Sequence, residues 1–147
     1  MPTIYIDTDN SNPDPAKKLY KATLAGGAAD RAERIMQSTI RKTLVAIPDF
    51  VTDPVKNPKG YAIRLSVAKV EVVGADTKCE LSGSIVRYPP EGTMKRGEGE
   101  VMVSTKMTGS ATASGKPPRA VVDCVEAITE DLVRKSVDAM RRDFAKR

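Results

Sequence analysis

The chain has 147 residues, a net charge of +5, and neither histidine nor tryptophan. Without histidine it lacks the commonest general base near neutral pH, the commonest metal ligand and the base of a Ser-His or Cys-His pair. We therefore expect no enzyme, no metal site and no cofactor. A chain of this length forms one domain, residues 1–147, and buries enough surface to fold without a metal or a disulfide.

Residues 1–14 predict a short strand and a turn-rich lead-in. Thr3–Ile6 is β-branched and aromatic, which favours a strand, and turn-forming residues follow it. Asp7–Ser11 begins like a calcium-binding loop, but Asn12 stands where that loop requires glycine, so we interpret the segment as a turn. The sequence leaves open whether residues 15–26 are helical.

Residues 28–47 predict an amphipathic helix. Apolar side chains recur there at three- and four-residue spacing, and charged side chains fill the remaining positions. Pro48 ends this helix. Residues 49–59 contain further prolines and predict a connector.

From Tyr61 onward the apolar positions alternate, which is typical of strands. Three antiparallel strands are expected, around residues 61–72, 78–85 and 100–107. The alternation changes parity after Ala68, which predicts either a β-bulge or a strand that is buried on both sides at its end. The third strand continues into Gly109–Gly115, where every side chain is small, as is typical of a backbone close to a helix or a neighbouring chain.

Residues 88–97 predict a long exposed loop, because their prolines and glycines are incompatible with the interior of a strand. This loop supplies our candidate interaction residues, which are Tyr88, Met94, Lys95 and Arg96.

A last helix is expected from about Arg119 to Phe144. The predicted element order is β-α-β-β-β-α. It describes an α+β domain with two helices packed on one face of a three- or four-stranded, mostly antiparallel sheet. The residues expected to be buried are Ile35, Ile40, Leu44, Ile63, Leu65, Leu81, Ile85, Val101, Val103, Val125, Ile128 and Leu132.

The two cysteines occupy core-facing positions in this scheme. Cys79 shares a strand face with Leu81, and Cys124 shares a helix stripe with Ile128. If the last helix packs on that strand face, the two sulfurs lie close together. Two interpretations stay open: a pair of buried thiols, or a disulfide that would indicate an oxidising compartment.

Other polar patterns favour a structural interpretation. Asp123, Glu126, Glu130 and Asp131 have the spacing of an exposed helix face near a helix start. The glycine pairs lack the surrounding residues of a phosphate loop. The outward positions of the strands carry charges of both signs and no aromatic residues, which disfavours a nucleic-acid-binding sheet.

The segment from about residue 61 to 140 resembles a known type of domain. The resemblance rests on three features: the small-residue strand Gly109–Ala113, the Cys79-Glu80 pair and the Asp123-Cys124 pair. They resemble an uncharacterised domain found with HEAT-like repeats in myxobacterial proteins. A more distant similarity is to envelope lipoproteins of the penicillin-binding-protein activator and curli-secretion types. The resemblance implies a non-enzymatic scaffold or interaction role, and a place outside the cytoplasm is compatible with it.

We therefore expect a non-enzymatic protein-interaction or assembly module of a bacterial complex, whose partner is another protein or a second copy. The alternative is a nucleic-acid-binding domain that uses Lys95, Arg96 and the basic C-terminal residues. No apolar run approaches the ~20 residues that span a bilayer. As the chain stands it is expected to be cytoplasmic, whereas a removed signal segment would make it periplasmic or secreted.

Overall fold

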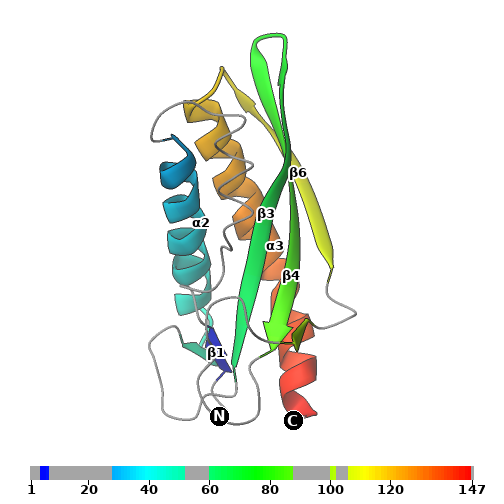
Figure 1. The fold of residues 1–147 in the computed structure, drawn as a ribbon. Helices are drawn as coiled ribbons and strands as arrows, with labels where there is room; N and C mark the ends of the chain where they lie inside the picture. The colour runs from blue at the N-terminus through cyan, green and yellow to red at the C-terminus, as the bar shows by residue number, and fades with distance from the viewer. Residues whose placement is uncertain (1–3, 7–27, 52–59, 88–99, 102–105, 147) are drawn as a thin grey trace.

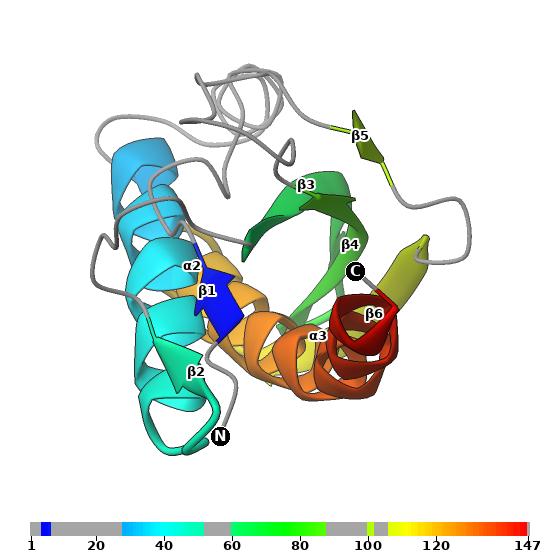
Figure 2. The ribbon, with the colours of Figure 1, turned by 90° about the horizontal axis from the view of Figure 1, so that it is seen from below.

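The computed structural model describes residues 4–6, 28–51, 60–87, 100–101 and 106–146. Two helices pack on one face of a mixed sheet, which confirms the predicted α+β class (Figure 1). Seen along its length, the sheet curves over both helices (Figure 2). The elements in chain order are β1 (Ile4–Ile6), α2 (Ala28–Val45), β2 (Phe50–Val51), β3 (Gly60–Val73), β4 (Asp76–Arg87), β5 (Glu100–Val101), β6 (Met107–Ser114) and α3 (Arg119–Ala145).

Among the described residues the sheet has six strands, where three or four were expected, because β2 is added and the expected third antiparallel strand appears as β5 and β6. Its order is β2-β1-β3-β4, with β5 and β6 both on the outer side of β4. β1 runs parallel to β2 and to β3, whereas the other pairs are antiparallel. The additional strand β2 lies in the expected connector. It forms because α2 returns the chain alongside β1, a long-range pairing that no local pattern reports.

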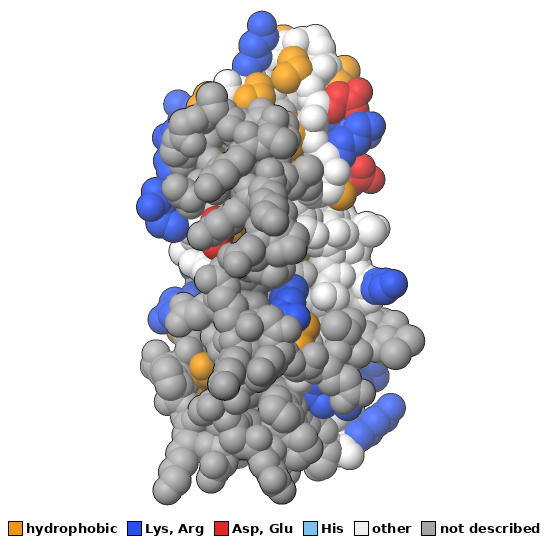
Figure 3. Space-filling view, in the orientation of Figure 1, with side chains coloured by type: hydrophobic (Ala, Val, Ile, Leu, Met, Phe, Trp, Pro, Cys, Tyr) orange, Lys and Arg blue, Asp and Glu red, His pale blue; other side chains and the backbone are white. Residues whose placement is uncertain are grey.

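β3 and β4 form a long hairpin paired from Tyr61↔Arg87 to Val73↔Asp76. The register shifts between Val67 and Lys69, which confirms the predicted bulge. Gly74 has φ +63°, a left-handed conformation that favours glycine at the tip. Near the tip Val72 and Val73 are about half exposed, and Figure 3 shows hydrophobic, basic and acidic side chains mixed at this end.

The two described parts of the third antiparallel strand, β5 and β6, are out of register with each other, which corrects the prediction of a single alternating strand. β5 pairs through Val86↔Val101, and β6 begins at Gly83↔Met107. Between these two pairs the third strand carries three residues more than β4. Three is an odd number, so the alternation expected to run from residue 101 to residue 107 does not hold across the break.

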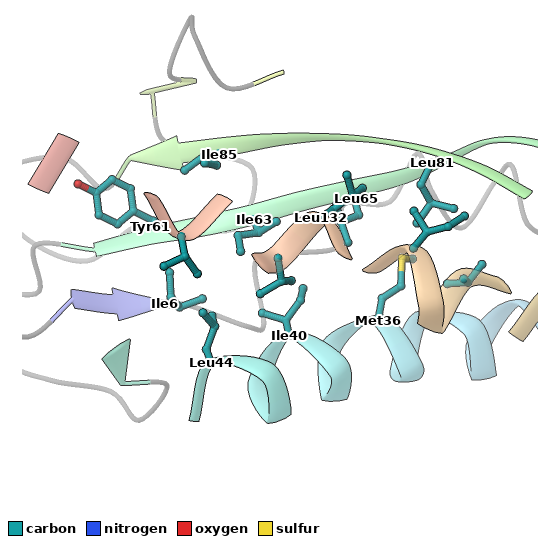
Figure 4. Packing of buried hydrophobic residues seen from close by; sticks show 14 of the residues in the cluster. Ile6, Met36, Ile40, Leu44, Tyr61, Ile63, Leu65, Leu81, Ile85 and Leu132 are labelled. Atoms are coloured by element: carbon teal, nitrogen blue, oxygen red, sulfur yellow. The ribbon is translucent and has the colours of Figure 1, made fainter. Parts of the chain in front are cut away.

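The core lies between the helices and the inner face of the sheet (Figure 4). Nine of the twelve residues expected to be buried are buried, and Ile35 is only half-buried. Residue 103 and the side chain of residue 101 lie outside the described part. The confirmed core residues are Ile40, Leu44, Ile63, Leu65, Leu81, Ile85, Val125, Ile128 and Leu132.

A buried carboxylate fixes the C-terminal end of α3 to the sheet. Tyr61 Oη donates a hydrogen bond to Asp143 Oδ2 at 2.6 Å, and Arg87 Nε donates to the same oxygen at 2.9 Å. A second guanidinium nitrogen of Arg87 pairs with Asp143 Oδ1. Since the carboxylate has a charged partner and a hydroxyl partner, its burial is compensated.

Candidate functional site

The outer edge of β6 is a row of backbone groups that no other described strand pairs with. β6 pairs with β4 from Gly83↔Met107 to Asp76↔Ser114, and no other strand among the described residues pairs with its far side. Figure 1 shows β6 at the lateral edge of the sheet. This edge is therefore the place where a further strand can join.

The direction of the hydrogen bonds identifies which residues of β6 face outward. The N–H of Gly115 donates to the carbonyl of Ala75 at 3.0 Å and continues the β4–β6 register. Successive residues of an antiparallel strand direct their N–H and C=O groups alternately toward and away from the partner. Residues 109, 111 and 113 therefore bond to β4, and residues 108, 110, 112 and 114 present their backbone groups at the open edge.

The composition of β6 leaves this edge unprotected. Exposed edges usually carry charges, proline or a bulge that prevents pairing with another chain. Met107–Ser114 has no charged residue and no proline, and its pairing with β4 is regular. The described edge is thus eight residues of uncharged strand.

The small side chains of β6 have a structural role at Gly109. A Cβ at this position would lie 2.7 Å from Ile128 Cγ2 on α3. The backbone of β6 therefore approaches α3 more closely than any other residue type would allow. This confirms the helix part of the sequence prediction and leaves the neighbouring-chain part as a prediction.

A hollow of about 450 Å³ opens on the sheet face away from the helices, beside the break between β5 and β6. Its polar lining consists of Arg64, Ser66, Ser82, Ser84, Lys106 and Thr108. The hydroxyls of Ser66 and Ser82 lie 3.0 Å apart, at hydrogen-bond distance. Burial lowers the pKa of Arg64 from its usual value.

The chemistry of this hollow is that of a polar surface. Its described lining offers hydroxyl groups and two cations, but no carboxylate or thiol that could serve as a base beside a nucleophile. The hydroxyls and cations can donate hydrogen bonds to a ligand or to a neighbouring chain. The geometry does not assemble an acid–base pair there.

The structure brings the two cysteines together. Cys79 on β4 and Cys124 on α3 are paired as a disulfide, with their Cα atoms 6.0 Å apart and a separation of 45 positions in the sequence. Both residues are buried in the core between the sheet and α3. The disulfide therefore joins β4, the strand that pairs with β6, to α3, the helix on which β6 packs.

The candidate interaction loop lies outside the described residues, so Tyr88, Met94, Lys95 and Arg96 are not placed. The same holds for the turn at residues 7–11. Among the described residues, no group of three or more potential ligands is arranged to hold a metal ion. None of the described helices is long and apolar enough to cross a membrane.

The four acidic residues that the sequence analysis assigned to an exposed face of the last helix are exposed or half-buried. Asp123 and Asp131 are exposed, and Glu126 and Glu130 are half-buried. Glu130 pairs with Arg134 at 3.1 Å, and Asp131 pairs with Lys135 at 2.8 Å. These i,i+4 ion pairs agree with the predicted exposed helix face rather than with an active site.

No family profile matches the chain, and no curated protein matches it. Solved structures with a similar backbone fold include a protein of Caulobacter crescentus CB15 that is described as a lipoprotein. It shares 14% identity, the match covers 80% of this chain and 86% of that one, and the TM-score is 0.47.

Two further structures are similar at the same level. A minor lipoprotein of Acinetobacter baumannii shares 10% identity over 95% of this chain and 94% of that one, with a TM-score of 0.46. A dodecameric PelC of Paraburkholderia phytofirmans shares 15% identity over 88% and 85%, with a TM-score of 0.42. Two of the three structures are described as lipoproteins, and none is described with HEAT-like repeats. At these identities and scores the likeness transfers neither a family nor a function.

Sequence reasoning missed the polar cluster of Asp143, Tyr61 and Arg87. One signal was present, because Asp143 lies three residues after Met140 and so falls on the apolar stripe of the last helix. A charged residue at such a position requires a buried partner. The identity of that partner depends on how the helix end meets the sheet.

Proposed function

We propose that this protein is a non-enzymatic interaction module that binds a partner strand along the open edge of β6. The observation that carries the proposal is the row of outward backbone groups at residues 108, 110, 112 and 114 on an uncharged edge. Addition of a strand to such an edge is a common mode of recognition, in which main-chain hydrogen bonds supply affinity.

The setting of β6 supports this role, because a rigid edge loses little conformational entropy on binding. β6 is paired over its whole length with β4. It is also held against α3 by the close approach at Gly109. The Cys79–Cys124 pair ties β4 to the same helix.

The absence of enzymatic chemistry and the envelope location are parts of the same proposal. The chain has no histidine, and the described lining of the hollow contains no general base. A disulfide between Cys79 and Cys124 would persist in an oxidising compartment such as the periplasm. No specific feature of the described surface favours nucleic-acid binding.

Substitution of proline at two adjacent positions tests the edge. Ser110→Pro removes an N–H that faces outward and leaves the β4–β6 ladder intact, so we expect a folded protein that no longer retains its partner. Ala111→Pro removes an N–H bonded to β4 and should lower the melting temperature. Ser110→Ala keeps the backbone donor and serves as the matched control.

The measurement is affinity capture from an envelope extract of the native host, with thermal melting of each variant as the folding check. Wild-type protein and Ser110→Ala should retain the same partner protein or second copy, and Ser110→Pro should not. Capture by Ser110→Pro at the wild-type level would contradict the proposal. Failure of the wild-type protein to retain any partner would also contradict the proposal.

A further inference from the structure

The outer face of the sheet carries a group of polar side chains that strand binding at the β6 edge does not use. β3, β4 and β6 lie side by side in the sheet (Figure 1). Leu65, Leu81 and Ile85 are buried in the core, so the residues that alternate with them on β3 and β4 face away from the helices. These outward residues line the hollow of about 450 Å³.

The strand registers arrange the polar lining of this hollow in two rows. Each row takes one residue from β3, one from β4 and one from the β6 side: Ser66, Ser82 and Thr108 in the first row, and Arg64, Ser84 and Lys106 in the second. Lys106 is placed by continuing the register one step beyond the pair Gly83↔Met107. With strands about 4.8 Å apart and a rise of about 3.3 Å per residue, the two rows cover roughly 10 by 7 Å.

Every polar side chain in this lining can donate a hydrogen bond. Serine and threonine hydroxyls donate and accept, whereas arginine and lysine only donate. The described lining therefore has two positive charges and no carboxylate. The next outward residue of β4 is Glu80, which lies outside this hollow and opposite Lys69 in the β3–β4 register.

Several of these donors are available to a ligand. Ser66 Oγ and Ser82 Oγ lie 3.0 Å apart, so one hydroxyl donates to the other and the second keeps its own hydrogen for a ligand. Within the described part of the chain, no hydrogen bond or ion pair involves the side chains of Ser84, Lys106 or Thr108.

We propose that this hollow binds the oxyanion group of a small ligand, a phosphate or a carboxylate. An oxyanion above Ser84 would lie between the guanidinium of Arg64 and the ammonium of Lys106, one strand to either side. Hydrogen bonds from cations to an oxyanion are about twice as strong as neutral ones. The hydroxyls of the first row supply further donors to the same ligand.

The position of Arg64 supports this site. Its side chain is half-buried, and burial disfavours the charged form and lowers its pKa. A nearby negative charge acts in the opposite direction, because it favours the charged form of the guanidinium. An oxyanion in the hollow therefore interacts more favourably with Arg64 than it would with a fully solvated cation.

The site is separate from the strand-binding edge. It uses side chains on the face of the sheet, whereas strand binding uses backbone groups at residues 108, 110, 112 and 114. Ser110 does not line the hollow. Ser110→Pro should therefore bind an oxyanion with the affinity of the wild type.

A nuclear magnetic resonance titration of the purified full-length protein tests the inference. The probes are inorganic phosphate, glucose 6-phosphate and glucuronate, with neutral glucose as the control, all at low ionic strength. At least one oxyanion should cause saturable shifts of the backbone amides of residues 64–66, 82–84 and 106–108, and glucose should cause none. The order of the three affinities distinguishes a free phosphate, a phosphate ester and a carboxylate.

Two lysine variants test which charge is responsible. Lys106→Gln removes one cation of the hollow and should raise the dissociation constant of the bound oxyanion about tenfold. Lys106 is exposed, so this change leaves the core intact. Lys78→Gln is the matched control, because it makes the same charge change on β4 outside the hollow and should leave the constant unchanged. Circular dichroism checks that both variants are folded.

The outcomes are independent of the proposed function. Failure of all three oxyanions to shift these amides overturns the inference. Equal weakening by Lys106→Gln and Lys78→Gln also overturns it, because it would indicate general attraction to a positive surface. Neither result bears on strand binding, which is tested by partner capture with Ser110→Pro.

Discussion

The two lateral edges of the sheet are built differently. At one edge the described strand β2 spans two residues, Phe50 and Val51, and a polar clamp lies beside it. In that clamp Arg141 donates two hydrogen bonds to the carboxylate of Asp49, and its guanidinium lies over the ring of Phe50. At the other edge β6 offers eight uncharged residues.

The difference indicates which edge is available for recognition. A very short strand presents few backbone groups to another chain, so it is protected against pairing. The β2 edge has this protection, and the clamp connects it to the end of α3. The β6 edge has neither charge nor proline. This difference between the described edges is the reason why the proposed function assigns strand binding to β6.

The largest effect is expected from the cysteine pair under the β6 side. A bridge that closes a loop of 45 residues contributes about 4 kcal/mol in the chain-entropy model. The double variant C79A/C124A should therefore lower the free energy of unfolding by ~2–4 kcal/mol in denaturant titrations. The β2 side has no comparable covalent tie among the described residues.

A thiol titration checks the premise of this prediction. Protein purified without reductant and unfolded in denaturant should show no reactive thiol. Two reactive thiols would mean that Cys79 and Cys124 are not bridged, and the stability difference should then shrink to that of two buried truncations. They would also remove the argument for an oxidising compartment.

A middle-sized effect is expected where β6 meets α3. Gly109→Ala places a methyl group 2.7 Å from Ile128 Cγ2 if nothing moves, so we expect a loss of about 1–3 kcal/mol. Ser110→Ala, the next residue, is the control and should change little. Both are measured by denaturant titration.

A double-mutant cycle sharpens this prediction. Gly109→Ala should cost less in an Ile128→Ala background, because that change removes the methyl group that the new Cβ would meet. Equal costs in both backgrounds would show that β6 is not held against α3 at this point.

The smallest effect is expected at the β2 edge, and it depends on pH. The hydrogen bond from Arg141 lowers the pKa of Asp49 from its usual 3.8. A lowered pKa in the folded state stabilises the protein above the unfolded value, and this contribution is lost as pH falls through the folded value. The effect is small, because both side chains stay in contact with solvent.

Comparison of wild type with Asp49→Asn measures this contribution. The difference in the free energy of unfolding should be constant at neutral pH and should fade in the acid range below pH 3.8. Arg141→Gln should show the same pH profile, since it removes the other half of the pair. If the difference in the free energy of unfolding instead grew as pH fell, the Asp49–Arg141 pair could not be the stabilising contact described here.

The sequence alone determined the elements whose cause is local. The two helices, the long β3–β4 hairpin and the bulge after Val67 follow from the spacing of apolar side chains, which depends only on the residues concerned. The same spacing identified most of the core. It also placed Cys79 and Cys124 on facing surfaces, because each shares a stripe with residues that must be buried.

The tertiary structure decided what depends on distant partners. The parallel pairing of β1 and β2, the break before β6 and the outward direction of residues 108–114 are properties of pairing register, and register depends on the neighbouring strand. Asp143 is buried only because Tyr61 and Arg87 meet it at the end of α3. Alternation along a strand states which side chains share a face. It cannot state which backbone groups remain without a strand beside them.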